Sequence, residues 1–320
     1  MAQTETKYVD IGIVVLKSFK TPLIFDVWIR RTATDYSKLF MKGDIIDWQR
    51  LEAYKSKGVD SLCVSELDYE RYSLFVEQMG EQLAANSAKF SDEDAAALLK
   101  EMVTYSMREI TVNANIDSRV IANSSNVVNG CVNAMQKDMK SIMKIIGVMG
   151  KNPYIFKHSI TTSILSVLLA QNSGMVSTNN LTILGLGAFL HDAGISQLSY
   201  DPEALASLTP DERKEMMRHP ELGKRLLDSV KGLRSEVLSI VMQHHEQPNG
   251  RGYPNGLREG EIYPMAKIVS IADTFSALIT KRSFRPGMSV LEALAVMKTD
   301  VGKFDKPLLD IFCKIFGGKV

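Results

Sequence analysis

The residues of this chain best suited to chemistry are its five histidines, none of which lies in the first 157 residues. Two short motifs stand out among them, HD at 191–192 and HH at 244–245, and Asp273 lies in the otherwise apolar segment KIVSIADTFSALI. Neutral imidazole and carboxylate are ligands of divalent transition metals. A single histidine in an apolar helix is usually a hydrogen-bonded core residue, but this concentration favours a metal site. The histidines are His158, His191, His219, His244 and His245.

The number of candidate ligands indicates two metal ions rather than one. The five histidines with Asp192 and Asp273 exceed what one tetrahedral site requires. Neighbouring residues on a helix point about 100° apart, so an adjacent pair can turn two ligands into one cavity. Two metals a few ångströms apart stabilise the attacking and leaving oxygens of a phosphoryl displacement. Metal binding also explains an HD pair beside the apolar run LTILGLGAFL, because either group alone is costly to bury.

A glycine-rich loop, EQPNGRGYPNGLREGE at 246–261, follows the HH pair. Gly252 allows the backbone to approach a ligand closely. Tyr253 can stack on a ring or hydrogen-bond to a phosphate oxygen. The alternative is a surface turn in which Tyr253 plugs the core.

Two arginines, Arg282 and Arg285, follow Asp273 in TKRSFRPG. Their spacing of three at a helix end lets both face one way and bind phosphate with two hydrogen bonds each. The alternative is that they are solvated and complement the C-terminus of the preceding helix.

The order of these motifs resembles the HD superfamily of metal-dependent phosphohydrolases. The HD pair, RHPELG around His219, the HHE doublet and the NGRGYPNGL loop make the chain similar to the HD-GYP subfamily, whose members hydrolyse the bacterial second messenger cyclic di-GMP. The resemblance covers about residues 150–305. It implies one metal held by His158, His191, Asp192 and Asp273, with Asp192 bridging to a second metal held by His219, His244 and His245.

The resemblance also implies a reaction. Two divalent ions, iron or manganese, would bind with Asp192 at the catalytic centre, and a metal-bridged hydroxide would open cyclic di-GMP to linear pGpG. The expected substrate contacts are Gly252, Tyr253, Arg282 and Arg285.

Four departures from the subfamily pattern bear on this reading. The usual Asp-Gly of the loop is Asn249-Gly250. Ile195 stands where the usual HDxGK lysine reaches the substrate phosphate, and Ser276 replaces an aspartate. Tyr154 stands where some members have a glutamate for a third metal, which favours two metals. Ile195 and the altered loop favour one alternative, a cyclic di-GMP receptor or scaffold with weak or no turnover. Another alternative is an HD phosphohydrolase for another nucleotide.

Helices must position these residues, and the pattern predicts a mostly α protein: a helical HD-domain bundle over 91–320 with a small α+β module at 1–90. The N-terminal module has strand-like runs at 9–16, 22–30 and 59–64, and it contains no histidine. We expect it to regulate or to bind signalling proteins. Apolar periodicity predicts the C-terminal helices at 155–171, 179–191, 210–229, 233–246, 263–281, 289–299 and 305–315.

The composition limits the partners and the cellular location that we expect for the protein. The net charge of +1 offers no overall field for nucleic acid or a membrane surface. Cys63, Cys131 and Cys313 are far apart and odd in number, which indicates no disulfide framework. No apolar stretch approaches the roughly 20 residues of a membrane span. These features predict a soluble, cytoplasmic protein.

Overall fold

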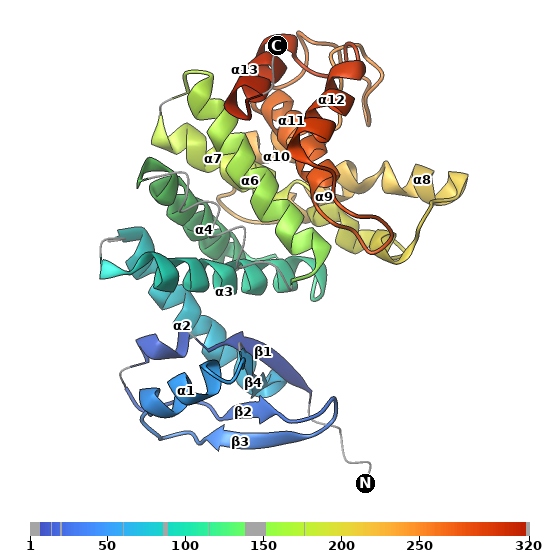
Figure 1. The fold of residues 1–320 in the computed structure, drawn as a ribbon. Coiled ribbons are helices and arrows are strands. Elements are labelled where there is room, and N and C mark those ends of the chain that lie inside the picture. The colour runs from blue at the N-terminus through green and yellow to red at the C-terminus, as the bar shows by residue number, and fades with distance from the viewer. Residues whose placement is uncertain are drawn as a thin grey trace. The chain divides into compact units, whose positions relative to one another are not determined.

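A computed structural model describes residues 7–13, 15–19, 21–59, 61–85, 89–114, 116–137, 152–175 and 177–317. The chain divides into two compact units, Met1–Tyr105 and Ser106–Val320. The division falls within helix α3 (Asp92–Thr111). Figure 1 shows strands in the first unit and helices in the second. Among the described residues, no helix combines the length and apolarity needed to cross a bilayer.

The first unit is built on a four-stranded antiparallel sheet with the order β1-β4-β2-β3. The predicted strand over 9–16 ends at Gly12, and a 3₁₀ turn (Val15–Ser18) follows. The sequence prediction missed β3, because only the last two residues of YSKLF are buried. The strands are β1 (Tyr8–Gly12), β2 (Val27–Arg30), β3 (Tyr36–Phe40) and β4 (Ser61–Ser65), and the short helix α1 covers Trp48–Lys55.

Helix α2 (Glu66–Ala85) completes the core of this unit. The Ser65 hydroxyl accepts a hydrogen bond from the Asp68 backbone N–H at 3.2 Å, so Ser65 caps the helix as its position predicts. Tyr69, Tyr72 and Val76 are buried on one stripe of the helix, the pattern of a helix packed on a core.

The second unit is helical and surrounds α6 (Tyr154–Asn172), which packs against α4, α7, α11 and α13. Side chains on every side of α6 are buried from His158 to Ala170, as expected for a central helix. The other helices are α4 (Ser118–Lys137), α7 (Thr178–Leu190), α8 (Pro210–Met216), α9 (His219–Asp228), α10 (Ser235–Gln243), α11 (Pro264–Ile279), α12 (Val290–Thr299) and α13 (Lys306–Ile315), with 3₁₀ turns η3 (Ala193–Gln197) and η4 (Pro202–Ala204).

One helix prediction in this unit is wrong. The single helix expected over 210–229 is two helices, because α8 ends at Met216 and α9 begins at His219. Pro220 lacks an N–H and its ring excludes the carbonyl of the preceding turn, so it fits only the first turn of a new helix. The break places His219 at a helix start. Apolar residues at helical spacing also predict helix over 113–150, of which 138–150 lie outside the described residues.

Candidate metal centre

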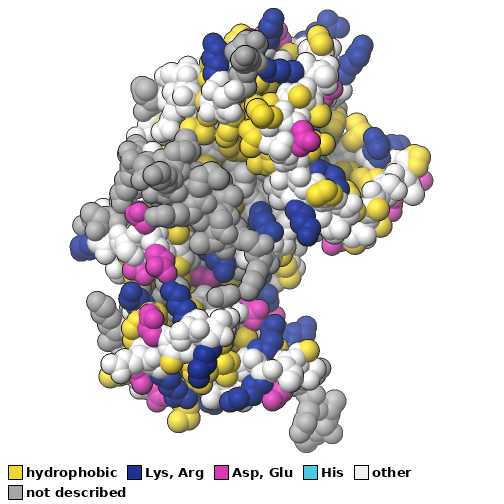
Figure 2. Space-filling model, viewed as in Figure 1, with side chains coloured by type: hydrophobic (Ala, Val, Ile, Leu, Met, Phe, Trp, Pro, Cys, Tyr) yellow, Lys and Arg dark blue, Asp and Glu magenta, His cyan; other side chains and the backbone are white. Residues whose placement is uncertain are grey.

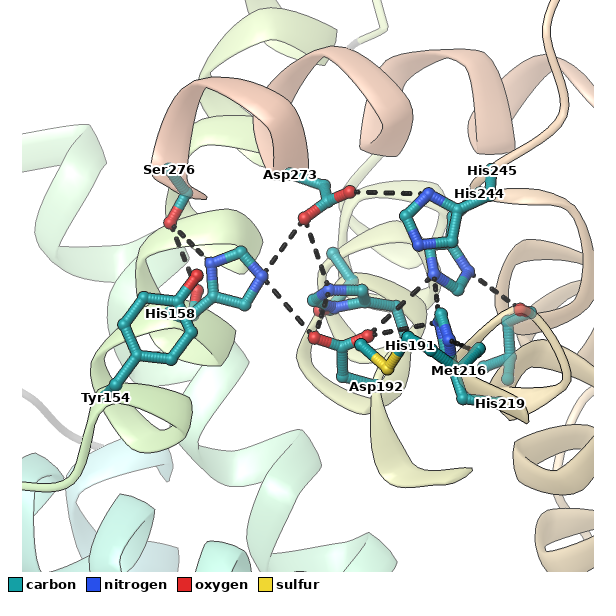
Figure 3. Close-up of polar contacts among 12 residues, drawn as sticks. Tyr154, His158, His191, Asp192, Met216, His219, His244, His245, Asp273 and Ser276 are labelled. Atoms are coloured by element: carbon teal, nitrogen blue, oxygen red, sulfur yellow. Dashed lines mark hydrogen bonds and ion pairs between the residues drawn. The ribbon is translucent and has the colours of Figure 1, made fainter. Parts of the chain in front are cut away.

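The structure brings all seven predicted ligands together, although they come from separate helices (Figure 3). His158 lies on α6 and Asp273 on α11. The others lie at helix ends: His191 and His244 are the C-caps of α7 and α10, and His219 opens α9. Helix ends suit this task because the side chains of several elements can converge there without interrupting a helix.

The ligand atoms form two groups, each within 4.8 Å. The first contains His158, His191 and Asp273, and His158 Nε2 lies 3.0 Å from Asp273 Oδ1. In the second group, His219 Nε2 lies 3.1 Å from His244 Nε2. This group is Asp192, His219, His244 and His245.

Asp192 lies between the two groups. Its Oδ2 is 3.2 Å from His191 Nε2 and 3.5 Å from His158 Nε2. Its other oxygen, Oδ1, is 3.3 Å from His219 Nε2 and 3.9 Å from His244 Nε2. One carboxylate therefore faces both groups, which is the geometry a bridging ligand needs.

His245 has the most exposed side chain of the seven candidate ligands. Its Nδ1 lies 3.8 Å from Asp273 Oδ2, and 27% of its side chain is exposed. Its ring also lines a cavity of about 360 Å³ that adjoins the cluster.

Backbone carbonyls fix the orientation of three of the imidazoles. In each case Nδ1 donates a hydrogen bond to the carbonyl three residues earlier, at the C-terminal end of a helix where carbonyls are free. Because a carbonyl only accepts, Nδ1 carries the proton and Nε2 keeps a lone pair. The pairs are His191 with Ala188 (2.6 Å), His219 with Met216 (2.8 Å) and His244 with Val241 (2.8 Å).

Ser276 has the same effect on His158. The Ser276 hydroxyl lies 3.1 Å from His158 Nδ1 and donates its own proton to the His158 carbonyl. It therefore accepts the Nδ1 proton and orients the ring so that Nε2 lies 3.0 Å from Asp273 Oδ1. The serine at this position orients a ligand.

These tautomers leave acceptor atoms facing one another in a buried space. His219 Nε2 and His244 Nε2 point at each other at 3.1 Å. Burial lowers the pKa of His219 and of His244, so a proton does not relieve the repulsion. A metal cation does, and the donor set fits one.

The two carboxylates are ionised. Burial works to raise the pKa of Asp192 and of Asp273, but the surrounding imidazoles, His191 foremost for Asp192 and His158 for Asp273, hold both values below the usual range. Burial acts to lower the pKa of His191, but the same two carboxylates raise it well above its usual range. The cluster thus offers two negative charges and imidazole nitrogens, a set that suits divalent cations.

Gly194 of the HDAG motif sets the spacing between Asp192 and His219. A Cβ at Gly194 would lie 2.0 Å from the His219 carbonyl oxygen and 2.4 Å from Gly223 N. Only glycine allows η3 to approach α9 this closely, and that approach brings the HD pair to His219.

Glu246, the third residue of HHE, is a functional residue that the sequence reasoning did not single out. Its buried carboxylate accepts hydrogen bonds from Asn255 N (2.7 Å) and Leu257 N (2.8 Å). It anchors the GYP loop to the end of α10. Its position between a ligand pair and a glycine-rich loop was the available signal.

The anchored loop carries Tyr253 to the cluster, with its ring centroid 4.6 Å from that of His245. Gly252 is required by the chain itself, because a Cβ there would lie 2.4 Å from Gln247 N and 2.6 Å from the His245 carbonyl oxygen. The close approach at Gly252 is thus between two backbone segments, and a substrate contact there stays a prediction.

The two arginines are joined by a backbone hydrogen bond from Arg282 N–H to the Arg285 carbonyl (3.0 Å), but their side chains have different partners. Arg282 lies over the Tyr154 ring, donates to its hydroxyl at 2.6 Å, and pairs with Glu203 at 3.3 Å. Arg285 instead donates to the carbonyls of Ala277 (2.5 Å) and Leu278 (3.2 Å) at the end of α11. Arg285 therefore matches the helix-capping alternative.

A cavity of about 360 Å³ opens beside the cluster. Tyr253 and Arg282 line it together with four of the ligands, and so does Lys303, which the sequence reasoning missed. Gly252, Ile195 and Arg285 are not among the lining residues. On the face shown in Figure 2, basic and acidic side chains are intermingled. The lining of the cavity includes one arginine and one lysine, Arg282 and Lys303.

Comparisons with known proteins agree with this geometry. The sequence profile of the HD domain family matches residues 148–308. Cyclic di-GMP phosphodiesterase PA4108 of Pseudomonas aeruginosa is 26% identical over 228 residues, covering 69% of this chain and 54% of that protein. Cyclic di-GMP phosphodiesterase response regulator RpfG of Xanthomonas campestris pv. campestris is 34% identical over 145 residues, or 44% of this chain and 37% of that protein. The chain thus spans about half or less of these relatives.

A solved structure shares the fold. Bd1817, an HDG"Y"P protein from Bdellovibrio bacteriovorus, superposes with a TM-score of 0.68 at 23% identity, covering 98% of this chain and all of the other. The chain belongs to the HD domain family, and its HD, HHE and GYP motifs resemble those of the HD-GYP subfamily.

Proposed function

We propose that this chain is a dinuclear-metal phosphodiesterase that hydrolyses cyclic di-GMP to linear pGpG. The observation that carries the proposal is the cluster of imidazole lone pairs around Asp192, where His219 Nε2 and His244 Nε2 face each other at 3.1 Å. Relatives named as cyclic di-GMP phosphodiesterases support the substrate class.

Two divalent ions, iron or manganese, complete the proposed site. His158, His191 and Asp273 would hold one, His219, His244 and His245 the other, and Asp192 both. Both metals accept nitrogen and oxygen ligands of this kind. When bound, they would lower the pKa of a water molecule and neutralise charge on the attacking and leaving oxygens.

The chain's own groups would bind and orient the substrate. Arg282, held by Tyr154 and Glu203 at the cavity wall, would donate to a phosphate oxygen, and Tyr253 would offer its ring to a base. Burial raises the pKa of the Tyr253 hydroxyl, so it stays protonated and able to donate a hydrogen bond.

One observation favours a second candidate, a cyclic di-GMP receptor with little turnover. Ile195 supplies no charge where the subfamily has a lysine, so one phosphate contact is missing. Such a receptor would keep the metals and bind the nucleotide without forming pGpG.

The setting of this activity is also part of the proposal. Cys63, Cys131 and Cys313 are buried free thiols, which suit the reducing cytoplasm. We assign the unit Met1–Tyr105 a regulatory or protein-binding role, because all seven candidate ligands lie in the other unit.

Product analysis tests these assignments. Metal-loaded protein is incubated separately with cyclic di-GMP, 3′3′-cGAMP and cyclic di-AMP, and products are separated by chromatography. Formation of pGpG fastest among the three substrates supports the proposal. Tight binding of cyclic di-GMP without product favours the receptor, and preferential cleavage of another dinucleotide reassigns the substrate.

A further inference from the structure

A second hollow of about 420 Å³ adjoins the cavity over the metal cluster. It lies between the GYP loop and the connection from α12 to α13. Gln247 and Lys303 line both spaces, so the hollow continues the cavity. The remaining polar lining consists of Asn249 and Arg251 from the loop, Thr299 from the end of α12 and Asp300 from the connection.

The two walls of the hollow are joined. The Asn249 backbone N–H donates to the Gly302 carbonyl at 3.0 Å. Gly302 has φ +79, and a Cβ there would lie 3.3 Å from the Asn249 side chain. The loop and the connection therefore stand at a fixed spacing without a ligand between them.

The hollow carries cations with unused donors. The exposed Arg251 guanidinium makes no hydrogen bond or ion pair within the described part of the chain. Lys303 Nζ lies 3.3 Å from Asp300, whose side chain is 47% exposed. A pair this exposed is weak, so Lys303 is available to another anion. An arginine and a lysine facing one space are the groups that bind phosphate.

We propose that this hollow binds the second phosphodiester of a cyclic dinucleotide while the first lies at the metals. The inference rests on the proposed function. A cyclic dinucleotide carries two phosphodiester groups on one ring, and only one can occupy the cluster at a time. Lys303, at the junction of the two spaces, and Arg251, beyond it, would meet the other. They would also supply positive charge in place of the lysine that Ile195 replaces.

Two substrates distinguish binding of the second phosphodiester in the hollow from a general effect on catalysis. Bis(p-nitrophenyl) phosphate has a single phosphodiester, so it reaches the metals but has no group for the hollow. Arg251→Gln and Lys303→Met are compared with wild type on this ester and on cyclic di-GMP. We expect each to raise KM for cyclic di-GMP, relative to KM for the ester, by about tenfold or more, the effect of one charge-assisted hydrogen bond. Lys306→Met, an exposed lysine on α13, is the control and should leave that ratio unchanged.

The outcomes are distinct. Equal losses on both substrates, or no loss on either, overturn the inference while the proposed function stands. A wild-type protein that cleaves the ester but neither binds nor cleaves any cyclic dinucleotide overturns both. A selective loss on cyclic di-GMP, larger in the double variant than in either single one, supports the hollow as the second phosphate site.

Discussion

Buried polar groups occur in both units of the chain, and they are satisfied in opposite ways. In the first unit, the buried Glu101 carboxylate accepts a hydrogen bond from the Tyr72 hydroxyl at 2.8 Å and another from the Gly12 backbone. In the second unit, His219 Nε2 and His244 Nε2 present lone pairs to each other. A buried polar group such as Glu101, whose hydrogen bonds are satisfied within the protein, stabilises the fold. Two buried acceptors that face each other, as in the histidine cluster, require a cation between them.

The charge states of the buried acids differ for the same reason. Burial raises the pKa of Glu101, whose hydrogen-bonding partners are neutral. Burial acts in the same direction on Asp192 and Asp273, but the imidazoles around them outweigh it and lower both pKa values. Burial alone therefore does not mark a functional acid, and the chemistry of its neighbours does.

The largest expected effect comes from replacing Asp192, whose carboxylate faces both ligand groups. Asp192→Asn removes the charge that both ligand groups share, and we expect activity to fall more than about 100-fold, because losing even a hydrogen-bond partner of a metal ligand costs about 10–100-fold. Metal at 100 times its Kd should stabilise wild type by about 2.7 kcal/mol, and this stabilisation should be lost in the variant. Thermal unfolding with and without metal measures it.

Glu101→Gln is the matched control for that experiment, since it changes a buried acid whose hydrogen bonds are satisfied within the protein. Its metal-dependent stabilisation should equal that of wild type. If Asp192→Asn and Glu101→Gln lost the metal-dependent stabilisation equally, the proposed difference between the metal cluster and the Glu101 hydrogen bonds would be contradicted.

The second effect separates the two arginines. Arg282→Ala removes a cation from the cavity wall and should raise KM for cyclic di-GMP about 10- to 100-fold, the range for a charged hydrogen bond. Arg285→Ala removes hydrogen bonds to the α11 carbonyls, so it should lower the free energy of unfolding by about 1–3 kcal/mol with KM little changed. Steady-state kinetics with urea denaturation checks both. A KM effect confined to Arg285→Ala would restore the substrate contact predicted from the sequence.

The third effect concerns the loop. Glu246→Gln keeps one acceptor oxygen and loses one of the two charged hydrogen bonds to the Asn255 and Leu257 N–H groups, at a cost of about 1.5–3 kcal/mol. We expect faster amide exchange in the GYP loop and a raised KM, with metal content unchanged. Loss of metal in this variant would instead make Glu246 part of the cluster.

The smallest effect is a pH dependence in the first unit. Because the pKa of Glu101 is raised above its usual 4.5 in the folded state, its contribution to stability is full below about 4.5 and is lost as pH rises through the folded pKa. Glu101→Gln does not titrate, so its free energy of unfolding relative to wild type should increase between pH 5 and pH 8. Urea unfolding at the two pH values checks the sign, and a decrease would contradict it.

Much of the cluster could be predicted from the sequence, because ligand chemistry depends on residue type and on motif order. The ligands on α6, α7, α9, α10 and α11 converge as the motifs imply. The sequence could not assign Arg282 and Arg285 to different tasks, since both fit a helix end and a phosphate equally well. It also could not place Lys303, whose approach to the cavity depends on the backbone contact between Asn249 and Gly302.

The fold shows the same limit in its short elements. The apolar runs of α6 and α7 predicted long buried helices, and these are present. Strand β3 was missed because hydrogen bonding to β2, rather than its own pattern, defines it. The break before α9 depended on Pro220, which the apolar periodicity over 210–229 concealed.

The most direct test of the central claim is the metal content of the anaerobically purified chain, measured by elemental analysis for wild type and for Asp192→Asn. If the facing imidazoles around Asp192 form a dinuclear centre, wild type should contain about two iron or manganese ions per chain, a number taken from the two ligand groups. The variant should fall well below that value. A wild-type content below one ion per chain, or a variant that retains the full content, would contradict the account.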